Sequence, residues 1–404
     1  MTTTPVIADA PMRTMGDALD EELQTLQASG LRRTMRVVQQ RQSGTVLLGG
    51  ERIADFASND YLGLASDPRI ARAAMAVLQA EGTGAGASRL ISGNHPIHGS
   101  LERALARYKG TSHALLFPSG YMVNVGVIPA LVDHRDVVYA DALNHASLVD
   151  GCRLSMATMR VFPHCDLDEL GAMLEADRGR YRRALIVVEG VFSMDGDLFP
   201  LDGLVDVAER FGAWTYVDDA HGTGVMGPTG AGATEQFGVT DRIDVVVGTL
   251  GKALGTSGAW VAGSQTLIEF LTSRARSFIF TTGSPPALAA AALESLRLAE
   301  VEPWRRDAVR ERARRLRERL RGADREVPGT ADAHIVPVVV GDPVRTMAVA
   351  GELRRRGFLV GGVRPPTVPA GTSRLRISVS AVHPLEVVDA LAANVIDVLR
   401  NSFR

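Results

Sequence analysis

The stretch VVVGTLGKALGTSG, residues 245–258, runs three valines into a glycine-rich turn that holds one lysine, Lys252. At the end of a buried strand an unpaired ammonium is costly, so burial favours the uncharged amine. The position therefore suits a lysine that acts as a nucleophile. The alternative interpretation is a lysine that binds phosphate in the pattern GxxxxGK[ST]. The sequence does not match this pattern, because Val246 replaces the first glycine and Ala253 replaces the serine or threonine.

Short apolar segments of the same kind recur along the chain from about residue 60 to 295. Several are apolar on both faces and alternate with helical patterns, which predicts an α/β fold with a mostly parallel central sheet flanked by helices. The candidate strands are ALLFPSG, DVVYAD, MRVFPH, ALIVVEG, WTYVDDAH and DVVVGT. Such sheets bind ligands beyond the carboxyl ends of their strands, and Glu189, Asp218 and Lys252 each lie at or just after such an end.

The chain divides into three expected regions. Residues 1–59 are expected to form an N-terminal arm and a helix, because the leucines of LDEELQTLQASGLRRTMRVV have helical spacing. Residues 60–295 are expected to form the large domain, which holds the strand ends where a ligand would bind. Residues 296–404 are expected to form a smaller α+β domain, with an arginine-rich helix and the strand candidates HIVPVVVGD, GFLVGGVRPPTV and RLRISVSA. Acidic residues are interspersed with those arginines, which favours a solvated helix over a nucleic-acid surface.

Composition excludes several classes of protein. A chain of 404 residues with 46% apolar residues is long enough for well-buried cores, and its net charge of -2 argues against nucleic acid or an anionic membrane as a partner. Its two cysteines, Cys152 and Cys165, offer neither a disulfide framework nor the spacing of a zinc cluster. No apolar run reaches the roughly 20 residues of a membrane span, and the first residues do not resemble a signal peptide. We therefore expect a cytoplasmic protein without a bound metal.

Asp218 and Lys252 together indicate the chemistry. Asp218 ends the apolar segment WTYVDD, where a buried carboxylate needs a cationic partner, although a helix-capping role is an alternative. A protonated pyridine nitrogen is a suitable partner. A carboxylate for a ring nitrogen and a lysine for an aldehyde are what pyridoxal 5'-phosphate requires, so the pair predicts this cofactor.

Other segments offer the remaining parts of a cofactor site. FPSGYMVN ends a strand and begins a helix near Gly120 and Tyr121, so N–H groups at that helix N-terminus can hold a phosphate. Thr249 can add a hydroxyl. His145, in the turn DALNHASL, can stack on a pyridine ring, although a histidine taken alone is more often a surface or core residue.

In these residues and motifs the chain resembles the α-oxoamine synthases, which are pyridoxal-phosphate enzymes of fold type I. These enzymes condense an amino acid with an acyl thioester and decarboxylate the product. The resemblance runs from LRRTMR to about residue 395 and rests on motifs that occur in the expected order. These are FASNDYLGLA, ISGNHPIHGSLE, LNHASLVDG, VEGVFSMDGD, DDAHGTGVMG, GTLGKALGTSGAW and TTGSPP.

The resemblance implies a role for each matching residue. Lys252 is the lysine that binds the cofactor and takes the substrate α-proton, Asp218 is the partner of the ring nitrogen, and His145 stacks on the ring and assists catalysis. His221 and Ser193 are implied to bind the phenolic oxygen of the cofactor. The phosphate of the cofactor is implied to bind Gly120, Tyr121 and Thr249 and, from the second subunit, Thr282. Arg376 is implied to bind the amino-acid carboxylate, with Asn59 near the substrates. Arg374 competes with Arg376, because both lie on one face of RLRIS.

Two motifs, DDAHGTGV and RPPTVPAGTSRLRISVSAVH, are similar to the branch of the family that joins L-alanine to a pimeloyl thioester in biotin biosynthesis. The resemblance therefore implies L-alanine and pimeloyl-CoA or a pimeloyl carrier protein as substrates, in a homodimer with a shared active site. Ser88 favours L-alanine over glycine, because a threonine at this position would crowd the substrate side chain. A paralogue that uses glycine or serine, or another acyl thioester, is the alternative.

Two weaker patterns have simpler explanations. Gly82, Gly84 and Ala87 imitate a dinucleotide fingerprint, but no strand precedes them and no acidic residue follows at the required distance. His95 and His98 have a spacing found in metal sites, yet no further ligands accompany them, so a loop and helix start is favoured.

Overall fold

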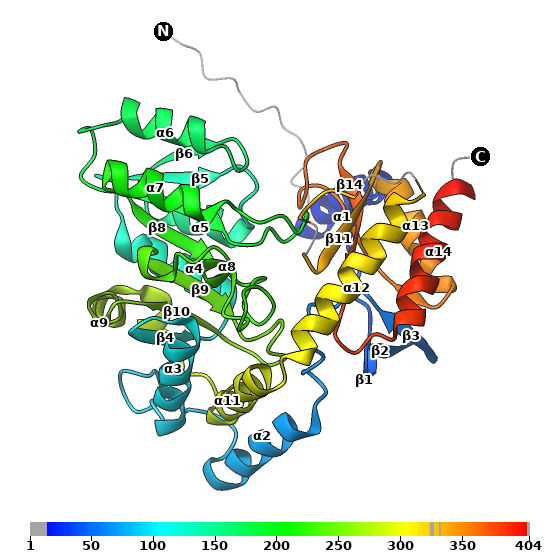
Figure 1. Ribbon diagram of the computed structural model, residues 1–404, viewed down its shortest axis with the longest axis horizontal. Helices are drawn as coiled ribbons and strands as arrows, with labels where there is room; N and C mark the ends of the chain where they lie inside the picture. Colours follow the sequence, from blue (N-terminus) through cyan, green and yellow to red (C-terminus); the bar gives the residue numbers. More distant parts are fainter. Residues whose placement is uncertain (1–13, 324–326, 331–332, 402–404) are drawn as a thin grey trace.

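The computed structural model describes residues 14–323, 327–330 and 333–401. Two bodies lie side by side, a larger one built on a seven-stranded sheet and a smaller one that holds the last part of the chain (Figure 1). The helix α12 (Trp304–Arg321) runs along the smaller body, and α11 (Pro286–Val301), which precedes it, packs on the larger one. Residue 296, where we predict a domain boundary, lies within α11.

The large sheet has the strand order β4-β10-β9-β8-β7-β5-β6. All its strands run parallel except β10, which is antiparallel to both of its neighbours. Its strands are β4 (His113–Phe117), β5 (Val137–Asp141), β6 (Thr158–Phe162), β7 (Ala184–Glu189), β8 (Trp214–Asp218), β9 (Val245–Thr249) and β10 (Ala259–Gly263). The six parallel strands are the six predicted ones; β10 is not among the predictions.

Both faces of this sheet are covered, which explains why its strands are apolar throughout. Alternate residues such as Val138, Val187 and Val247 pack in one cluster with α4, α5 and α9, while Val137, Val188 and Val246 pack in another with α3, α6 and α7. The helices of the large body are α2 (Pro68–Glu81), α3 (Pro96–Lys109), α4 (Gly120–Leu131), α5 (Ala146–Leu154), α6 (Leu167–Ala176), α7 (Leu201–Phe211), α8 (Ala233–Gln236), the 3-10 helix η1 (Thr240–Arg242), α9 (Gln265–Arg274) and α10 (Arg276–Ile279).

The smaller body contains two sheets. One is antiparallel, with the order β11-β14-β13, and the other joins N-terminal strands to the C-terminal region in the order β1-β2-β3-β12. Its elements are β1 (Gln39–Gln42), β2 (Thr45–Leu48), β3 (Glu51–Asp55), β11 (Ile335–Gly341), α13 (Pro343–Arg355), β12 (Phe358–Leu359), β13 (Gly361–Val363), β14 (Ser373–Ser378) and α14 (Leu385–Asn401). The segment GFLVGGV therefore forms two short strands that pair with different sheets.

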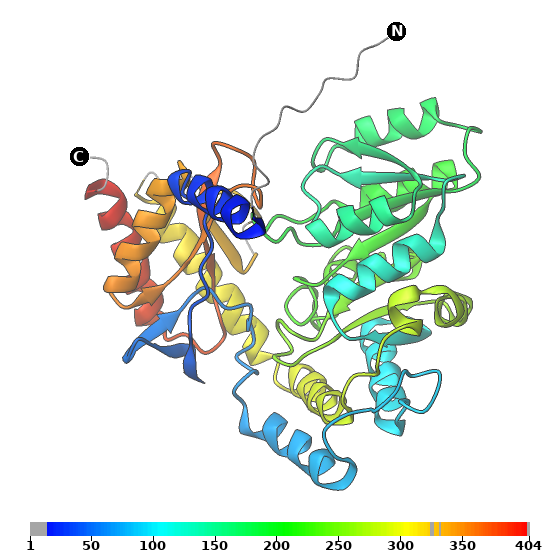
Figure 2. The same ribbon diagram turned by 180° about the vertical axis from the view of Figure 1, so that it is seen from behind.

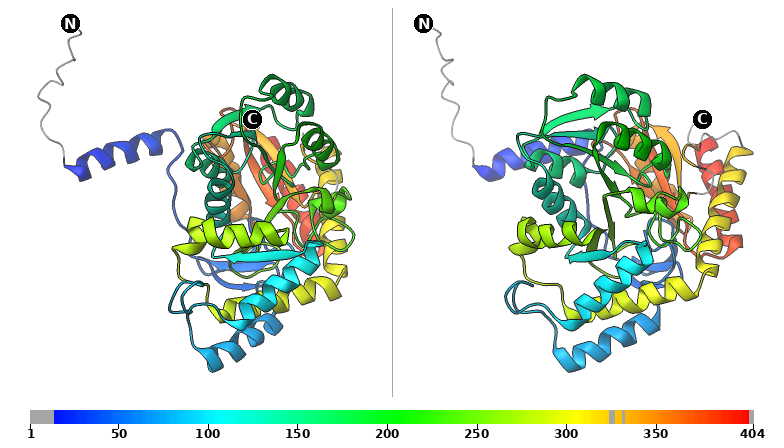
Figure 3. Two further views of the ribbon diagram at one scale, coloured as in Figure 1. Left: turned by 90° about the vertical axis from the view of Figure 1, so that its left-hand side faces the viewer. Right: turned by 60° about the vertical axis from the view of Figure 1, so that its left-hand side comes forward.

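The helix α1 (Met15–Ala28) lies apart from the rest of the chain. Thr14 caps it, and none of its residues is buried. Figure 2 shows it in front of the smaller body, and Figure 3 shows it projecting from the side of the molecule. Its apolar side chains Leu19, Leu23 and Leu26 are 46%, 38% and 40% exposed, so this face has no partner within the described chain.

Candidate active site

The three residues that the sequence places at strand ends lie at one edge of the large sheet. Glu189 ends β7 and Asp218 ends β8, and the two residues are paired in register. Lys252 follows β9 by three residues. Because these strands are parallel neighbours, their carboxyl ends bring an amine and two carboxyl groups together, as predicted.

The turn after β9 fixes the backbone of Lys252. The N–H of Gly255 donates to the carbonyl of Lys252 at 2.8 Å, and that of Thr256 donates to Leu250 at 2.9 Å. Gly255 has a φ of +61°, and a Cβ there would lie 2.4 Å from the nitrogen of Ala65, so only glycine fits. The glycines of this stretch thus shape the turn that presents the lysine.

The Lys252 amine lies at the end of a buried hydrogen-bonded chain. Its Nζ is 2.9 Å from His221 Nε2, and His221 Nδ1 is 2.7 Å from the Tyr61 hydroxyl. Burial lowers the pKa of His221 well below its usual value, so the ring is neutral. With its proton on Nδ1, His221 donates to Tyr61 and accepts from Lys252 through Nε2. Burial also lowers the pKa of Lys252 to about 8, although the charges of Asp218 and Glu189 oppose the shift.

Asp218 is a buried carboxylate that no cation neutralises. It accepts hydrogen bonds from Asn124 Nδ2 at 2.8 Å and from the N–H of Ala220 at 3.0 Å, and no ion pair involves it within the described residues. The next residue, Asp219, is different, because Lys109 Nζ donates to it at 2.7 Å and both side chains are fully buried. The structure therefore leaves Asp218, rather than Asp219, available for a cationic ring.

His145 caps helix α5 beside these groups. Its Nδ1 is 2.7 Å from the Ser147 hydroxyl, which also accepts a hydrogen bond from Asn124 at 2.9 Å. Asn124 thus bonds both Asp218 and the residue that orients His145. Desolvation of the ring lowers the pKa of His145, which favours a neutral imidazole.

Glu189 is a strand-end residue to which we assign no role from the sequence. Its Oε2 accepts a hydrogen bond from the N–H of Ser193 at 3.3 Å, whereas its buried Oε1 has no partner among the described residues. Burial, reinforced by the charge of Asp218, raises the pKa of Glu189 to about 8. Burial therefore favours the protonated form of this carboxyl group.

The structure separates the two arginines of RLRIS. Arg374 forms an ion pair with Asp195, so its charge is already neutralised. Arg376 donates instead to uncharged groups: the carbonyl of Ser193 at 2.5 Å, Asn59 Oδ1 at 3.0 Å and Ser378 Oγ at 2.9 Å. No carboxylate pairs with Arg376 in the part of the chain that is described, so it is the arginine suited to bind a substrate carboxylate.

The N-terminus of α4 lies close to Thr249. Ser119 caps this helix and accepts from the N–H of Met122 at 3.3 Å, while the N–H groups of Gly120 and Tyr121 have no acceptor within the described residues. A Cβ on Gly120 would lie 3.8 Å from Thr249 Cβ. Two free N–H groups beside a hydroxyl are suited to bind a phosphate.

Comparisons with known proteins show the family to which this chain belongs. A family model described as aminotransferase class I and II matches residues 51–395. The 8-amino-7-oxononanoate synthase of Anaeromyxobacter sp. (strain K) is 49% identical over 383 residues, which cover 95% of this chain and 96% of the relative. The chain belongs to the 8-amino-7-oxononanoate synthases of this aminotransferase family.

Solved structures agree with this family assignment. A serine palmitoyltransferase from S. paucimobilis with bound PLP has a TM-score of 0.91 at 32% identity and covers 96% of this chain and 99% of its own. An 8-amino-7-oxononanoate synthase from Francisella tularensis has a TM-score of 0.75 at 27% identity, with 87% and 99% covered. The predicted fold class, the resemblance to the α-oxoamine synthases and the dependence on pyridoxal phosphate are thereby confirmed.

The residues at the sheet edge fit pyridoxal phosphate. An amine with a lowered pKa, a buried carboxylate without a cation, an imidazole and a helix N-terminus beside a hydroxyl surround one edge of the sheet. Tyr61 and Asn124 are further members of this site that we do not predict from the sequence. The motif SNDYLGL, which contains Tyr61, is the one feature of the sequence that could have indicated a site role for Tyr61. Asn124 lies within an apolar helix, and no motif indicates such a role for it.

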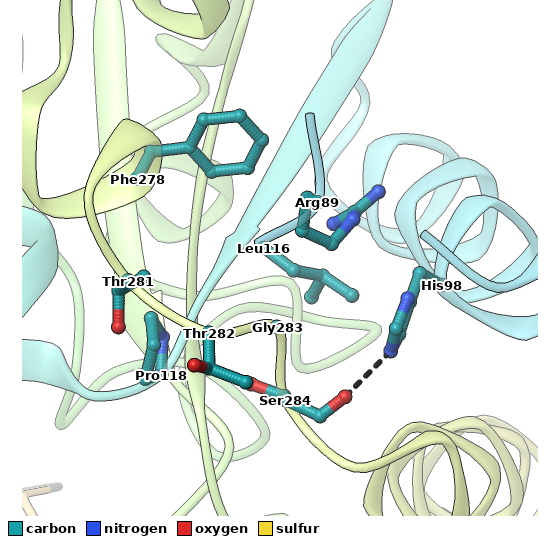
Figure 4. Close-up of a pocket in the computed structure, with 9 residues that line it drawn as sticks. All are labelled: Arg89, His98, Leu116, Pro118, Phe278, Thr281, Thr282, Gly283 and Ser284. Carbon is teal, nitrogen blue, oxygen red and sulfur yellow. Dashed lines mark hydrogen bonds between the residues drawn. The ribbon is translucent and has the colours of Figure 1, made fainter. Parts of the chain in front are cut away.

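Two further predicted site residues, Ser88 and Thr282, lie on neighbouring loops. The N–H of Gly283 on one loop donates to the carbonyl of Ala87 on the other at 2.9 Å. Thr282 is exposed and lines a small pocket with Arg89, Pro118 and Thr281 (Figure 4). Among the described residues, no hydrogen bond or ion pair joins Ser88 or Thr282 to Lys252, Asp218 or His221.

Proposed function

We propose that this chain joins L-alanine to a pimeloyl thioester and releases the free thiol and carbon dioxide, giving 8-amino-7-oxononanoate for biotin biosynthesis. The observation that carries the proposal is that Lys252 and Asp218, at the edge of the large sheet, lie near Arg376 of β14, which is linked to Lys252 through Tyr61 and His221, in a chain of this family. A reactive amine, a carboxylate for a ring nitrogen and a guanidinium for a carboxylate are the groups that this reaction requires.

The cofactor supplies the electronic part of the reaction. Bound pyridoxal phosphate offers an aldehyde to an amine and a ring that withdraws electron density from the α-carbon of an amino acid. Lys252 would hold the aldehyde carbon, Asp218 the ring nitrogen, and His145 one face of the ring. The other proposed contacts are Ser193 and His221 to the phenolic oxygen, and Gly120, Tyr121 and Thr249 to the phosphate.

Lys252 is the proposed base for the α-proton of L-alanine. Its pKa of about 8 allows Nζ to accept a proton near neutral pH, which an ordinary lysine does poorly. His221 Nε2, 2.9 Å away, accepts a hydrogen bond from the amine and so fixes the direction of its lone pair. Tyr61, whose hydroxyl donates to Asn59 Oδ1, accepts a hydrogen bond from His221 Nδ1 and so holds His221 from its other side.

Arg376 is the proposed ligand of the alanine carboxylate. Asn59 and the carbonyl of Ser193 fix its guanidinium, and Nη2, whose one hydrogen bond within the described residues is to the Tyr61 hydroxyl at 3.4 Å, is proposed to donate to the carboxylate. Because the carboxylate leaves later as carbon dioxide, the arginine must hold it without an acid that could protonate it. The uncharged partners of Arg376 meet this requirement.

The acyl step uses the open side of the site. The α-carbon forms a bond with the thioester carbonyl carbon while the thiolate leaves, and the loss of carbon dioxide is followed by return of a proton to the α-carbon. His145 is proposed to assist, because it is neutral and its ring has an exposed side. Coenzyme A and an acyl carrier protein are both proposed as thiol carriers.

The functional unit is proposed to be a homodimer in which Ser88 and Thr282 reach the partner's site. The absence, within the described residues, of a polar contact between these two side chains and Lys252 supports this, as do exposed apolar side chains on the molecular surface. Ile91, Phe280 and Met35 are 82%, 71% and 101% exposed, and the apolar face of α1 adds to them.

No helix of the described residues is long and apolar enough to cross a membrane. We place the enzyme in the cytoplasm, a location that its two unpaired cysteines support.

A second candidate is a related condensation that uses L-serine or glycine with a longer acyl thioester. The solved serine palmitoyltransferases, at a TM-score of 0.91, favour it. The higher identity to 8-amino-7-oxononanoate synthases, 49%, favours the first candidate.

The two candidates are separated by product release. The holoenzyme is incubated with each of L-alanine, glycine and L-serine, together with pimeloyl-CoA, a pimeloyl carrier protein or palmitoyl-CoA. Free thiol and carbon dioxide should appear in equal amounts with L-alanine and a pimeloyl thioester. Equal release with L-serine and palmitoyl-CoA alone would replace the first candidate with the second.

A further inference from the structure

His164 lies between two carboxylates outside the set of cofactor-site residues. It follows β6, and its Nδ1 is 3.0 Å from Asp141 Oδ1 while its Nε2 is 2.5 Å from Asp197 Oδ2. Ionised carboxylates only accept hydrogen bonds, so both ring nitrogens carry a proton and the ring is an imidazolium. Burial alone would lower the pKa of His164, but the hydrogen bonds to Asp141 and Asp197 raise it to about 12.

Asp141 connects this imidazolium to the turn that carries His145. Asp141 ends β5, and its fully buried carboxylate also accepts from the N–H of Leu143 at 2.8 Å and from that of Cys165 at 2.9 Å. The turn at 141–144 is therefore built around the same carboxylate that His164 neutralises. His145, the proposed ring-stacking residue, follows this turn directly.

Asp197 connects His164 to the hairpin that carries Ser193. The hairpin is closed by a bridge between Val191 and Leu198, and the N–H of Phe192 donates to the carbonyl of Asp197 at 2.9 Å. The Phe192 ring contacts the His164 ring edge to face at 4.4 Å. The next residue, Ser193, accepts from Arg376 Nε through its carbonyl.

The same hairpin is also held from the smaller body, where Arg374 pairs with Asp195. The hairpin at 191–198 therefore carries two charged contacts, one from Asp197 to His164 and one from Asp195 to Arg374. It also carries the carbonyl of Ser193, which accepts a hydrogen bond from Arg376. We propose that His164 is a positioning residue, whose charge holds this hairpin against the β5 turn and so sets the position of Arg376 relative to His145 for amino-acid binding. The inference rests on the proposed function, because it assigns the alanine carboxylate to Arg376.

A metal site is the competing interpretation of this cluster. Cys165 Sγ lies 3.8 and 3.6 Å from the two nitrogens of His164, and Asp141, His164 and Cys165 offer ligand atoms within 4.8 Å of one another. A metal ligand, however, needs a lone pair on a ring nitrogen. Here both nitrogens face carboxylate oxygens at hydrogen-bond distance, which favours the proton over the metal.

The test measures alanine binding without turnover. The holoenzyme is titrated with L-alanine in the absence of a thioester, and the dissociation constant is read from the visible absorption of the cofactor. His164→Gln and Asp197→Asn are each expected to raise this dissociation constant about tenfold. The double variant should raise it no further, because both substitutions break the same contact, the one between His164 and Asp197. Cofactor content per subunit should stay at the wild-type level. The control is His134→Gln, since His134 is largely exposed and 3.9 Å from Asp133.

Each outcome decides the question. Unchanged alanine binding in both variants, with only a lower melting temperature, would make His164 structural and overturn the proposal. Zinc present in the purified wild-type protein and lost in His164→Gln would replace it with a metal site. A wild-type holoenzyme that does not bind L-alanine would contradict the proposed function instead.

Discussion

At the scale of single residues, the chemistry depends on which charges are left without a partner. The chain has two lysines, and the structure gives them opposite surroundings. Lys109 is fully buried and paired with Asp219, whereas Lys252 bonds a neutral histidine. Asp218 and Arg376 likewise lack the ion pairs that Asp219 and Arg374 form. Within the described residues, the member of each comparison that forms no ion pair is the one to which we assign a role in the proposed site.

The lowered pKa of Lys252 predicts a pH dependence for covalent attachment of pyridoxal phosphate. Only the uncharged amine attacks an aldehyde, and for a lysine with a lowered pKa the charged form is lost as the pH rises through about 8 rather than 10.5. The attachment rate of the cofactor-free enzyme should therefore rise with a midpoint near pH 8. Borohydride reduction at timed intervals and peptide mapping measure this rate. Label on Lys109, or a midpoint near 10.5, would contradict the assignment of Lys252.

Ser88 is predicted to determine the choice of amino acid. Its carbonyl accepts from the N–H groups of Ile91 and Gly93 at 3.1 and 2.9 Å, which fixes its loop. The extra methyl of Ser88→Thr should lower kcat/KM for L-alanine relative to glycine by about tenfold or more. Ser92→Thr, an exposed change on the same loop, is the control. The ratio of the two specificity constants is compared in all three proteins, and an unaltered ratio in Ser88→Thr would leave Ser88 with a structural role alone.

Sequence patterns alone could not separate Arg374 from Arg376. Their side chains lie on one face of a strand, and what distinguishes them is Asp195, which is 179 residues away from Arg374 along the chain. Asp218, Lys252 and Glu189 were predictable because strand ends are visible in the sequence as apolar segments that stop at a charged residue. Partners that meet only after folding, such as Tyr61 and Asn124, leave no such local pattern.

At the scale of helices and strands, the parallel part of the sheet was predictable because burial on both faces makes each strand apolar throughout. The antiparallel strand β10, with the sequence AWVAG, was missed because it is rich in small residues and follows a glycine-rich turn instead of a helix. The strands β1 to β3 were missed because they are short and bury few of their residues, and β3 is completed by β12, about 300 residues later in the chain.

The contact between the end of α3 and the end of β8 predicts an effect on stability. Lys109→Met would leave Asp219 buried without its cation, which costs about 3–5 kcal/mol of unfolding free energy. Urea denaturation of the cofactor-free protein measures the loss. Adding Asp219→Asn should restore part of it, because the amide oxygen can still accept from the N–H of Ala233. Arg314→Met, which removes an exposed pair with Glu318, is the control and should change little. A Lys109→Met protein as stable as the wild type would contradict the prediction.

At the scale of the whole molecule, the site draws on distant parts of one chain. The large body supplies Lys252 and Asp218, the smaller body supplies Arg376 from β14, and Asn59 comes from the segment after β3. Ser88 and Thr282 remain on adjoining loops that make no polar contact with these groups within the described residues. A second copy that brings these loops to the opposite site would complete both sites at once, as a two-fold dimer does.

Mixed dimers test this arrangement directly. Lys252→Ala removes the covalent attachment, and Thr282→Glu places a carboxylate where the partner's phosphate is proposed to bind. Each homodimer should be inactive or nearly so. If Thr282 serves the partner's site, a dimer with one subunit of each kind has one intact site, because the Thr282→Glu subunit supplies the lysine and the Lys252→Ala subunit supplies the threonine. Random mixing should then restore about a quarter of the wild-type turnover. If Thr282 instead acts within its own chain, every site in the mixture is damaged and mixing restores no activity.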